Sequence, residues 1–445
     1  MLLASSGGAI RSHKDIDALP NSVSGQTSGS IHNCGVYSLN LPALREGHLP
    51  HAASVVLSFG DNSQSQLGVK TSTSSGSVVT VDLLRGLDFV SVAAGGSSSF
   101  ALSNQGGIYA WGSNRQLELG LREELRGADS PMALKLLTGC VASQVATTSS
   151  AIGQAHTLVL DRQTGAVFGF GSQPDGALGL GEKELRSEAK ILRFTSGTKI
   201  RQVACGLRHS LLLDETGRVW TFGDNRQGQL GQQTAATGAM THSFRPLLVS
   251  GLCNVKLIAC GDAHNLAVVE TEGKPFLYGW GQNSCGQLGL GHYLPQPEPA
   301  LVAHLNDLTS VVSVACGAQH SLVVADDGRR SFAFGSDNCG QLGVTSETSK
   351  ALAGNSETTR CIPTLIHSVS KVAGRRIVQA AAAGSHSLLL DISGQVFVFG
   401  DNAHGQLGSD HKTVKEPTVV HALRTWQVRY IATSDKHSVC LATGN

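Results

Sequence analysis

Histidine and cysteine are the residue types here that could support acid–base, metal or redox chemistry, and the chain has 17 and 10 of them. Six histidines recur in one setting, after a small-residue and glycine stretch and before an apolar run, as in ACGLRHSLLL at 204–213: His156, His209, His264, His320, His386 and His437. Imidazole is a general base near neutral pH, but six copies in repeated units cannot serve one reaction centre. We therefore predict partly buried imidazoles that hydrogen-bond to backbone between adjacent strands.

The cysteines also follow the repeat. Cys205, Cys260 and Cys316 stand directly before glycine, where other units carry Ala94, Ile152, Ala382 and Thr433. Such a position favours a small, buried side chain, and Cys285 and Cys339 share a second repeat position. No CxxC pair occurs, so we expect reduced thiols and neither a disulfide framework nor a metal site.

Signatures of covalent catalysis and cofactor binding are missing from the sequence. There is no GxSxG elbow and no HExxH motif. The GxG fragments lie in strand turns and have no following amphipathic helix whose N-terminus could hold a phosphate. We expect no catalytic residues and no cofactor, so the chain is not predicted to be an enzyme.

The elements that position these residues repeat seven times. An aromatic residue followed by glycine comes first in each unit, and nine residues later a second glycine follows a leucine, usually in Gln-Leu-Gly; the aromatic residues are Phe59, Trp111, Phe170, Phe222, Trp280, Phe334 and Phe399. Between these landmarks, short apolar segments alternate around glycine-containing turns, as strands do. A period of 50 to 65 residues with three to four short antiparallel strands is typical of propeller blades.

The ends of the repeat array indicate ring closure. The first unit begins with a returning strand at 54–60, and the last unit ends with a histidine strand at 437–441. Together they would complete one blade, whereas an open β-solenoid, the alternative architecture, needs no complementary ends. The sequence therefore predicts an all-β, seven-bladed β-propeller over 54–445, with a flexible N-terminal arm at 1–53 and a long interblade insertion at 344–379.

The aromatic-glycine, Gln-Leu-Gly and glycine-histidine motifs resemble the regulator of chromosome condensation repeat family over all of the chain except residues 1–53. This resemblance implies a seven-bladed propeller. The family includes exchange factors for Ran-type small GTPases, a plant ultraviolet-B photoreceptor and proteins whose propeller holds partners. Fold alone does not choose among these functions.

The two residues before each repeated histidine vary while their neighbours do not. A loop position that the fold leaves free, on one face of a ring, can form a binding surface. In the resembling family, this loop class engages the GTPase in exchange factors and carries the photoreceptor's chromophore tryptophans. We therefore name a candidate partner-binding face: Arg208, Asp262, Gln319, Ser385, Asp435 and Lys436.

Two family functions can be tested on these loops. The photoreceptor pattern Gly-Trp-Arg-His-Thr comes closest at 206–210, which reads GLRHS and lacks the tryptophan. Asp262 and Asp435 stand where an exchange factor would place acidic residues. The segments 121–145 and 344–379, however, do not read as the protruding hairpin of those proteins.

Composition favours a protein partner. Charged residues make up 15% of the chain and the formal net charge is +1, so direct nucleic-acid binding is not expected. The sequence contains no run of 18 apolar residues, so a membrane span is not expected. We expect a cytoplasmic or nuclear non-catalytic protein-binding propeller, acting as an interaction scaffold or regulatory adaptor. Guanine-nucleotide exchange on a Ran-type or other small GTPase is the alternative.

Overall fold

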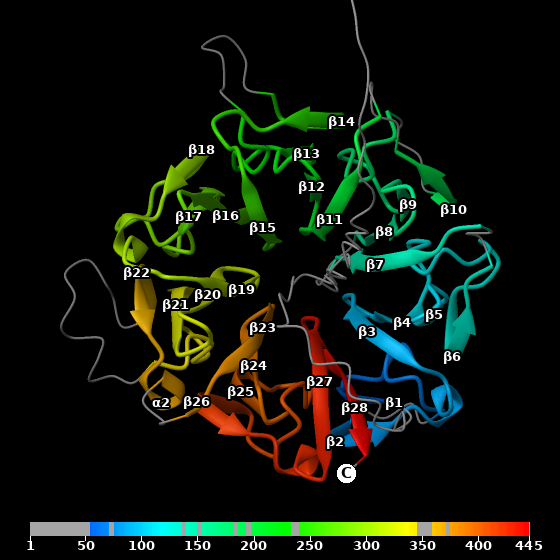
Figure 1. The fold of residues 1–445 in the computed structure, drawn as a ribbon. Coiled ribbons are helices and arrows are strands. Elements are labelled where there is room, and N and C mark those ends of the chain that lie inside the picture. Colours follow the sequence, from blue (N-terminus) through cyan, green and yellow to red (C-terminus); the bar gives the residue numbers. More distant parts are fainter. Residues whose placement is uncertain are drawn as a thin grey trace, which may run out of the picture. The chain divides into compact units, whose positions relative to one another are not determined.

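Seven antiparallel sheets of four strands each form the computed structural model of this chain (Figure 1). The structure describes residues 54–70, 75–135, 139–148, 154–181, 186–192, 197–232, 240–344, 358–370 and 374–444. The predicted arm at 1–53 lies outside these ranges. The all-β, seven-bladed propeller predicted from the sequence is confirmed.

Each blade is named here after its innermost strand, which in Figure 1 is the one nearest the middle of the ring. The first three blades in chain order contain β3 (Phe89–Ala94), β4 (Ser98–Ser103), β5 (Ile108–Ser113) and β6 (Gly127–Ala133); β7 (Ala142–Thr147), β8 (His156–Asp161), β9 (Val167–Gly171) and β10 (Arg186–Ile191); and β11 (Ile200–Cys205), β12 (His209–Asp214), β13 (Val219–Asp224) and β14 (His242–Leu248). The next three contain β15 (Val255–Cys260), β16 (His264–Thr271), β17 (Lys274–Gly281) and β18 (Gln296–Leu301); β19 (Val311–Cys316), β20 (His320–Ala325), β21 (Arg330–Ser336) and β22 (Thr359–Leu365); and β23 (Ile377–Ala383), β24 (His386–Asp391), β25 (Val396–Asp401) and β26 (Thr413–Val419).

Strands from both ends of the propeller complete the seventh blade. Its order from the outside is β2 (Ser75–Thr80), β1 (Ser54–Gly60), β28 (His437–Gly444) and β27 (Trp426–Thr433). The β1–β28 ladder runs from Ser54 opposite Thr443 to Gly60 opposite His437, and Figure 1 shows the blue and red ends side by side. The predicted closure is confirmed, and the open solenoid is excluded.

The outer strands were harder to predict. β6 falls inside 121–145, and β22, the short helix α2 (His367–Ser370) and the start of β23 fall inside 344–379. The predicted insertion at 344–379 therefore encloses β22, an edge strand of the β19 blade. The connection between β21 and β22 is shorter than the predicted insertion. Edge strands pair on one side only and are partly exposed, so β22 and β6 lack the apolar alternation of the inner strands.

The repeated aromatic-glycine pair is a consequence of close packing. In all seven copies this glycine has a φ between +101° and +119°, a backbone region that L side chains rarely adopt. A Cβ at Gly223 would lie 2.4 Å from the carbonyl oxygen of Arg208. The aromatic residue is buried in every blade, and the indoles of Trp111 and Trp280 donate to the backbone carbonyls of Gln66 and Gln229. These two tryptophans pack the blades, as predicted.

Seven equivalent hydrogen bonds join the blades into a ring. In each blade, the side chain that follows the repeated histidine position donates to the main-chain carbonyl of the residue before Leu-Gly in the preceding blade, over 2.7–2.8 Å. The pairs are Ser99–Gln66, Thr157–Glu118, Ser210–Ala177, Asn265–Gln229, Ser321–Gln287, Ser387–Gln341 and Ser438–Gln406. Every junction of the ring thus has the same polar link, which we call the interblade bond.

The repeated histidines reinforce this bond from the other side. Their Nε2 atoms lie 2.5–2.9 Å from a side-chain oxygen of the next blade: His437–Ser99, His156–Ser210, His209–Asn265, His264–Ser321, His320–Ser387 and His386–Thr433. The prediction of partly buried rings bonded to backbone is wrong, because the imidazoles are fully buried and pair with side chains. Only the assembled ring reveals these partners. The β3 blade has Ser98 at the histidine position, so at its junction with the β7 blade no imidazole accompanies the interblade bond.

Hydrogen bonding and burial together set the protonation state of these imidazoles. Where the accepting hydroxyl already gives its own proton to a carbonyl, the imidazole must supply the proton from Nε2, which fixes the tautomer of the neutral ring. Burial lowers the pKa of His156, His264, His320 and His386 to about 3, and the pKa of His209 and His437 to about 4. The ring is therefore assembled from neutral histidines.

This burial predicts that acid weakens the fold. Below pH 6.5 the unfolded chain binds protons on these histidines that the folded chain does not bind until about pH 3, so the free energy of unfolding is highest above pH 6.5 and falls as pH drops. One such histidine contributes a slope of about 1.4 kcal/mol per pH unit. Urea unfolding measured between pH 7.5 and 4.5 gives the number of protons taken up on unfolding, from the slope of the free energy of unfolding against pH. At the acid end of this range, His320→Gln should lower that number by about one. His304→Gln, at an exposed site, is the control, and an unchanged slope in His320→Gln would contradict the account.

Candidate functional site

A rigid frame carries the loops that contain the predicted binding residues. These loops join the innermost strand of each blade to the second strand, and the face that they form is called here the His-loop face. The carbonyl directly before each histidine position accepts a hydrogen bond of 2.8–2.9 Å from the amide that follows the repeated aromatic-glycine pair; the accepting residues are Ser97, Ala155, Arg208, Ala263, Gln319, Ser385 and Lys436. These hydrogen bonds fix the main chain. The side chains at the seven positions vary in size and charge, and only serine and alanine each occur twice.

The neighbouring loops between the third and fourth strands are locked by their own polar residues. In the β11 blade the Gln229 amide donates to Asp224, and its oxygen accepts the main-chain N–H of Gln227. Asn225 accepts the N–H of Leu230 and donates to the carbonyl of Met240. Equivalent contacts recur in other blades. The Asp, Asn and Gln of this motif therefore stabilise the turn and are not free to bind a partner.

The structure brings all six predicted residues to the His-loop face. Gln319 is exposed, and the other five are partly buried: Arg208, Asp262, Ser385, Asp435 and Lys436. The Gln319 side chain accepts a weak contact from the thiol of Cys285, over 3.5 Å. Their role in partner binding stays a prediction.

Arg208 belongs to a charge network that the sequence did not reveal. Its guanidinium lies 3.4 Å from Asp175 of the β7 blade, and the same carboxylate pairs with Arg226 at 2.9 Å. The Arg208 and Arg226 side chains are 39% and 51% exposed, so such pairs stabilise the fold by about 0–1 kcal/mol. The signal lay in the variable middle positions of the Gln-Leu-Gly loops, where Asp175 and Arg226 stand.

Asp262 and Asp435 interact with each other although two blades separate them in the ring. Burial raises the pKa of Asp262 to about 7, and the charge of Asp435 adds to this rise. The carbonyl of Asp262 accepts the N–H of Leu207, and the carboxylate of Asp435 lies against Gly384, where a Cβ would be 3.0 Å from Oδ1. Burial of the Asp262 carboxylate costs stability at neutral pH, and a cation beside it would relieve that cost.

A hollow of about 360 Å³ lies between the seventh blade and the β3 blade, among third-to-fourth strand loops of this face. Arg115, Arg126 and Asp129 provide its charged lining, and the Ser65 hydroxyl donates to Asp129 across the two blades. Sequence reasoning missed this hollow, because its walls come from segments about 60 residues apart.

The buried cysteines are unreactive. Burial raises the pKa of Cys205 and Cys316 to about 12 and raises that of Cys260 as well, so the nucleophilic thiolate is not formed at neutral pH. The cysteines in the described ranges are free thiols. Within those ranges no group of three or more His, Cys, Asp or Glu side chains could hold a metal ion.

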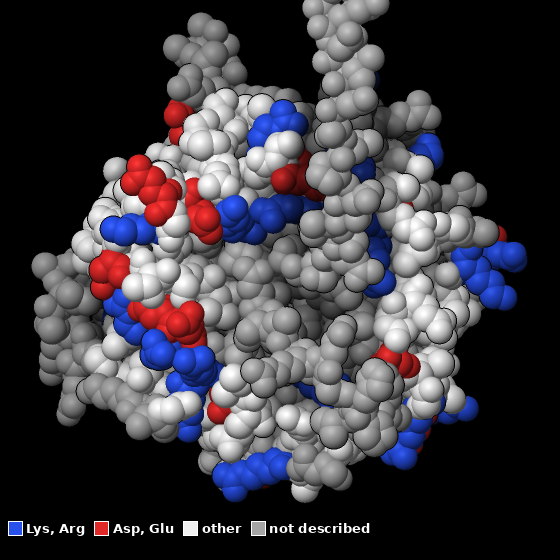
Figure 2. All heavy atoms as spheres, in the orientation of Figure 1, with Lys and Arg blue, Asp and Glu red and all other residues white. Residues whose placement is uncertain are grey.

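Charge is mixed on the face that Figure 2 shows. Among the described residues of that face, patches of lysine and arginine alternate with patches of aspartate and glutamate, and neither sign forms a continuous field. Nucleic-acid binding depends on such a field of positive charge. Among the helices of the described residues, none is long and apolar enough to cross a membrane.

Comparison with known proteins gives one family match, to the RCC1-like domain, over residues 55–440. The E3 ubiquitin-protein ligase HERC2 of Homo sapiens is 30% identical over 397 residues, which is 87% of this chain and 8% of HERC2. The ultraviolet-B receptor UVR8 of Arabidopsis thaliana is 32% identical over 291 residues, 65% of this chain and 62% of UVR8. The chain thus spans less than two thirds of the length of either relative.

Solved structures agree on the fold. Prp20p of Saccharomyces cerevisiae, described with its binding to Gsp1p and histones, superposes with a TM-score of 0.76 at 22% identity, covering 89% of this chain and 93% of Prp20p. Human WBSCR16 superposes with a TM-score of 0.73 at 22% identity, covering 88% and 99% of the two chains. At this identity the likeness concerns the propeller fold.

Proposed function

Since this chain belongs to the family of RCC1-like domain proteins, we propose that it is a non-catalytic protein-binding propeller, an interaction scaffold or regulatory adaptor whose His-loop face holds the partner. One observation carries the proposal: the main chain before each histidine position is hydrogen-bonded in the same way in seven blades, while the side chains there vary from blade to blade. A rigid scaffold with variable loop side chains is a common design of binding surfaces.

The charges on the His-loop face indicate the chemistry of a matching partner. Arg208 and Arg226 share one carboxylate and remain half exposed, whereas Asp262 and Asp435 repel each other. A partner with a basic side chain opposite the two aspartates and an acidic one opposite the arginines would match both. Such alternation of sign fits a folded protein better than a nucleic acid. The cytoplasm or the nucleus is the expected location.

This proposal predicts that partner capture depends on the aspartate pair. Tagged wild-type protein should retain at least one specific protein, and the Asp262→Asn, Asp435→Asn double variant should retain it at least tenfold less, since close charge pairs at a protein interface contribute about 1.5–7 kcal/mol. Quantitative mass spectrometry of the captured proteins measures this ratio. Glu416→Gln is the matched control, because its exposed carboxylate lies on the outer strand β26. Equal recovery by all three proteins would remove the His-loop face from the proposal.

A second candidate function is guanine-nucleotide exchange on a small GTPase. It is favoured by one observation, that the His-loop face carries two acidic loop residues, Asp262 and Asp435, whose charges influence each other, because acidic loop residues at this place are what the exchange factors of the family use. No counterpart of their protruding hairpin is found in the described parts of 121–145 and 344–379, which contain the outer strands β6 and β22. The scaffold therefore remains the first proposal.

Nucleotide release separates the two functions. The exchange hypothesis predicts that catalytic amounts of the wild-type protein accelerate release of fluorescent GDP from one member of a panel of small GTPases, and that Asp262→Ala or Asp435→Ala slows that release at least tenfold. Glu416→Ala should behave as the wild type. If no GTPase on the panel responds, exchange is abandoned and the scaffold function is unaffected.

A further inference from the structure

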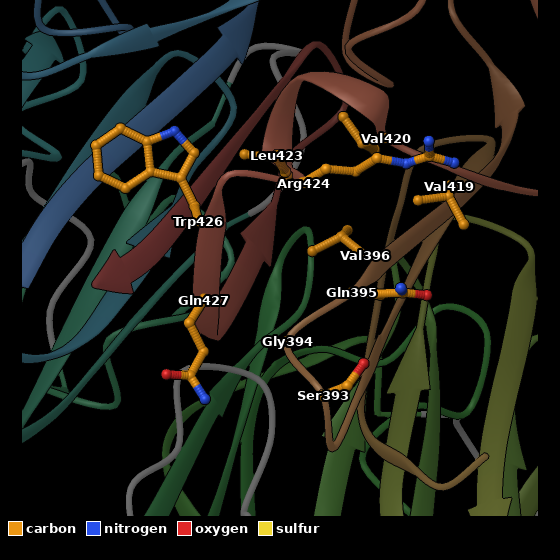
Figure 3. Close-up of a pocket in the computed structure, with 10 residues that line it drawn as sticks. All are labelled: Ser393, Gly394, Gln395, Val396, Val419, Val420, Leu423, Arg424, Trp426 and Gln427. Carbon is orange, nitrogen blue, oxygen red and sulfur yellow. The ribbon is translucent and has the colours of Figure 1, made fainter. Parts of the chain in front are cut away.

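A second concave site lies away from the His-loop face, at the junction of the β23 blade and the seventh blade (Figure 3). It is bounded by the turn between β24 and β25, by the end of β26, and by the connection through the 3-10 helix η3 (His421–Leu423) to the start of β27. Because each blade's second strand runs from the His-loop face to the opposite end, the β24–β25 turn lies at that opposite end. The volume of the concave site is about 620 Å³, within the range of ligand sites.

The floor of this groove is apolar. Val396, Val420 and Leu423 lie beneath it, each no more than 2% exposed, and the partly buried side chains of Val419 and Trp426 provide its accessible apolar surface. Such a floor can accept one large aliphatic or aromatic side chain, whose burial would contribute about 1.5–3 kcal/mol. The groove therefore has an apolar subsite on well-packed strands.

The rim is polar and has no carboxylate. Arg424, Gln395 and Gln427 are exposed there, and in Figure 3 the Arg424 side chain extends from the η3 connection toward Val419. The Arg424 guanidinium and the two carboxamides make no hydrogen bond or ion pair with any side chain or backbone group of the described residues. Beneath the rim, Asp391 is already engaged: it accepts the hydroxyl and N–H of Ser393 and the N–H of Gln395, and lies 4.0 Å from Arg375.

A matched position elsewhere in the ring differs from Arg424 in its ion pairing. Arg85 caps the 3-10 helix η1 (Asp82–Leu84) just as Arg424 caps η3, and each donates its N–H to the first residue of its helix. Arg85 pairs with Asp82 at 2.9 Å. In η3 the residue that corresponds to Asp82 is His421, so this helix supplies no carboxylate for Arg424.

We propose that this groove binds an extended peptide segment of a partner protein, in which one large apolar side chain fills the floor and a carboxylate one or two residues away pairs with Arg424. The carboxamides of Gln395 and Gln427 each offer a donor and an acceptor, which suits a peptide main chain. A guanidinium and a carboxylate form a strong, directional pair. The groove and the His-loop face lie at opposite ends of the blades, so one chain could hold two partners and act as an adaptor.

A random dodecapeptide library displayed on phage tests this proposal. Peptides enriched on the wild-type protein and depleted on Arg424→Glu should share a large apolar residue within two positions of Asp or Glu. Synthetic versions should bind Arg424→Glu at least tenfold more weakly than the wild type. Arg85→Glu is the matched control, because it reverses the same cap position at another junction, and it should bind as the wild type does.

A second readout places the peptide in the groove. The four tryptophans can be labelled as 5-fluorotryptophan, and Trp426→Phe assigns the fluorine resonance of the groove. Bound peptide should shift that resonance and leave those of the buried Trp111 and Trp280 unchanged. The proposal is overturned if no peptide separates the wild type from Arg424→Glu, if the selected peptides lack an acidic residue, or if the Trp426 resonance does not move. The Asp262 and Asp435 variants should still bind the peptide, so this test is independent of the His-loop face.

Discussion

The interblade bond is the interaction on which the structure depends. A hydroxyl or amide after each histidine position reaches the carbonyl before Leu-Gly in the preceding blade, at all seven junctions. A buried backbone carbonyl without such a donor costs about 1–3 kcal/mol, so each blade needs its neighbour for polar satisfaction as well as for apolar packing. The same bond explains two repeated motifs: the histidine that donates to the hydroxyl and the Gln-Leu-Gly turn that presents the carbonyl. The glycine of the aromatic-glycine pair has another cause, because a Cβ there would meet the carbonyl before the histidine position in the same blade.

Repetition made the blades predictable from sequence, and the same repetition hid their junctions. The seven aromatic-glycine pairs mark one strand per blade, and the incomplete units at 54–60 and 437–441 predicted the closing β1–β28 ladder. The histidine partners could not be predicted, because a hydroxyl such as Ser387 is 67 residues from His320 in the chain and adjacent only in the ring. Alignment by motif also failed in the β7 blade: Thr147, and not Ile152, takes the place of Cys205, since Thr147 pairs with Thr157 as Cys205 pairs with Ser210.

The candidate sites also differ in how far the sequence predicts them. The variable residues on the His-loop face could be found by comparing the seven units with one another, because the fold fixes everything around them. The Arg208–Asp175–Arg226 network and the groove beside Arg424 could not, since their members come from segments that meet only when the blades are assembled. A break in the repeat was the only available signal: Asp175 stands where other loops carry glutamine, cysteine or histidine, and His421 stands where η1 has Asp82.

Site-specific photo-crosslinking tests the central claim, that partners are held by the His-loop face. A benzoyl-phenylalanine placed at Gln319, which is exposed on that face, and another placed at Glu416, which is exposed on β26, would be irradiated in cells and the adducts identified by mass spectrometry. The account predicts a discrete protein adduct from position 319 and none of that identity from position 416. The same adduct from position 416, or adducts from position 416 alone, would contradict it.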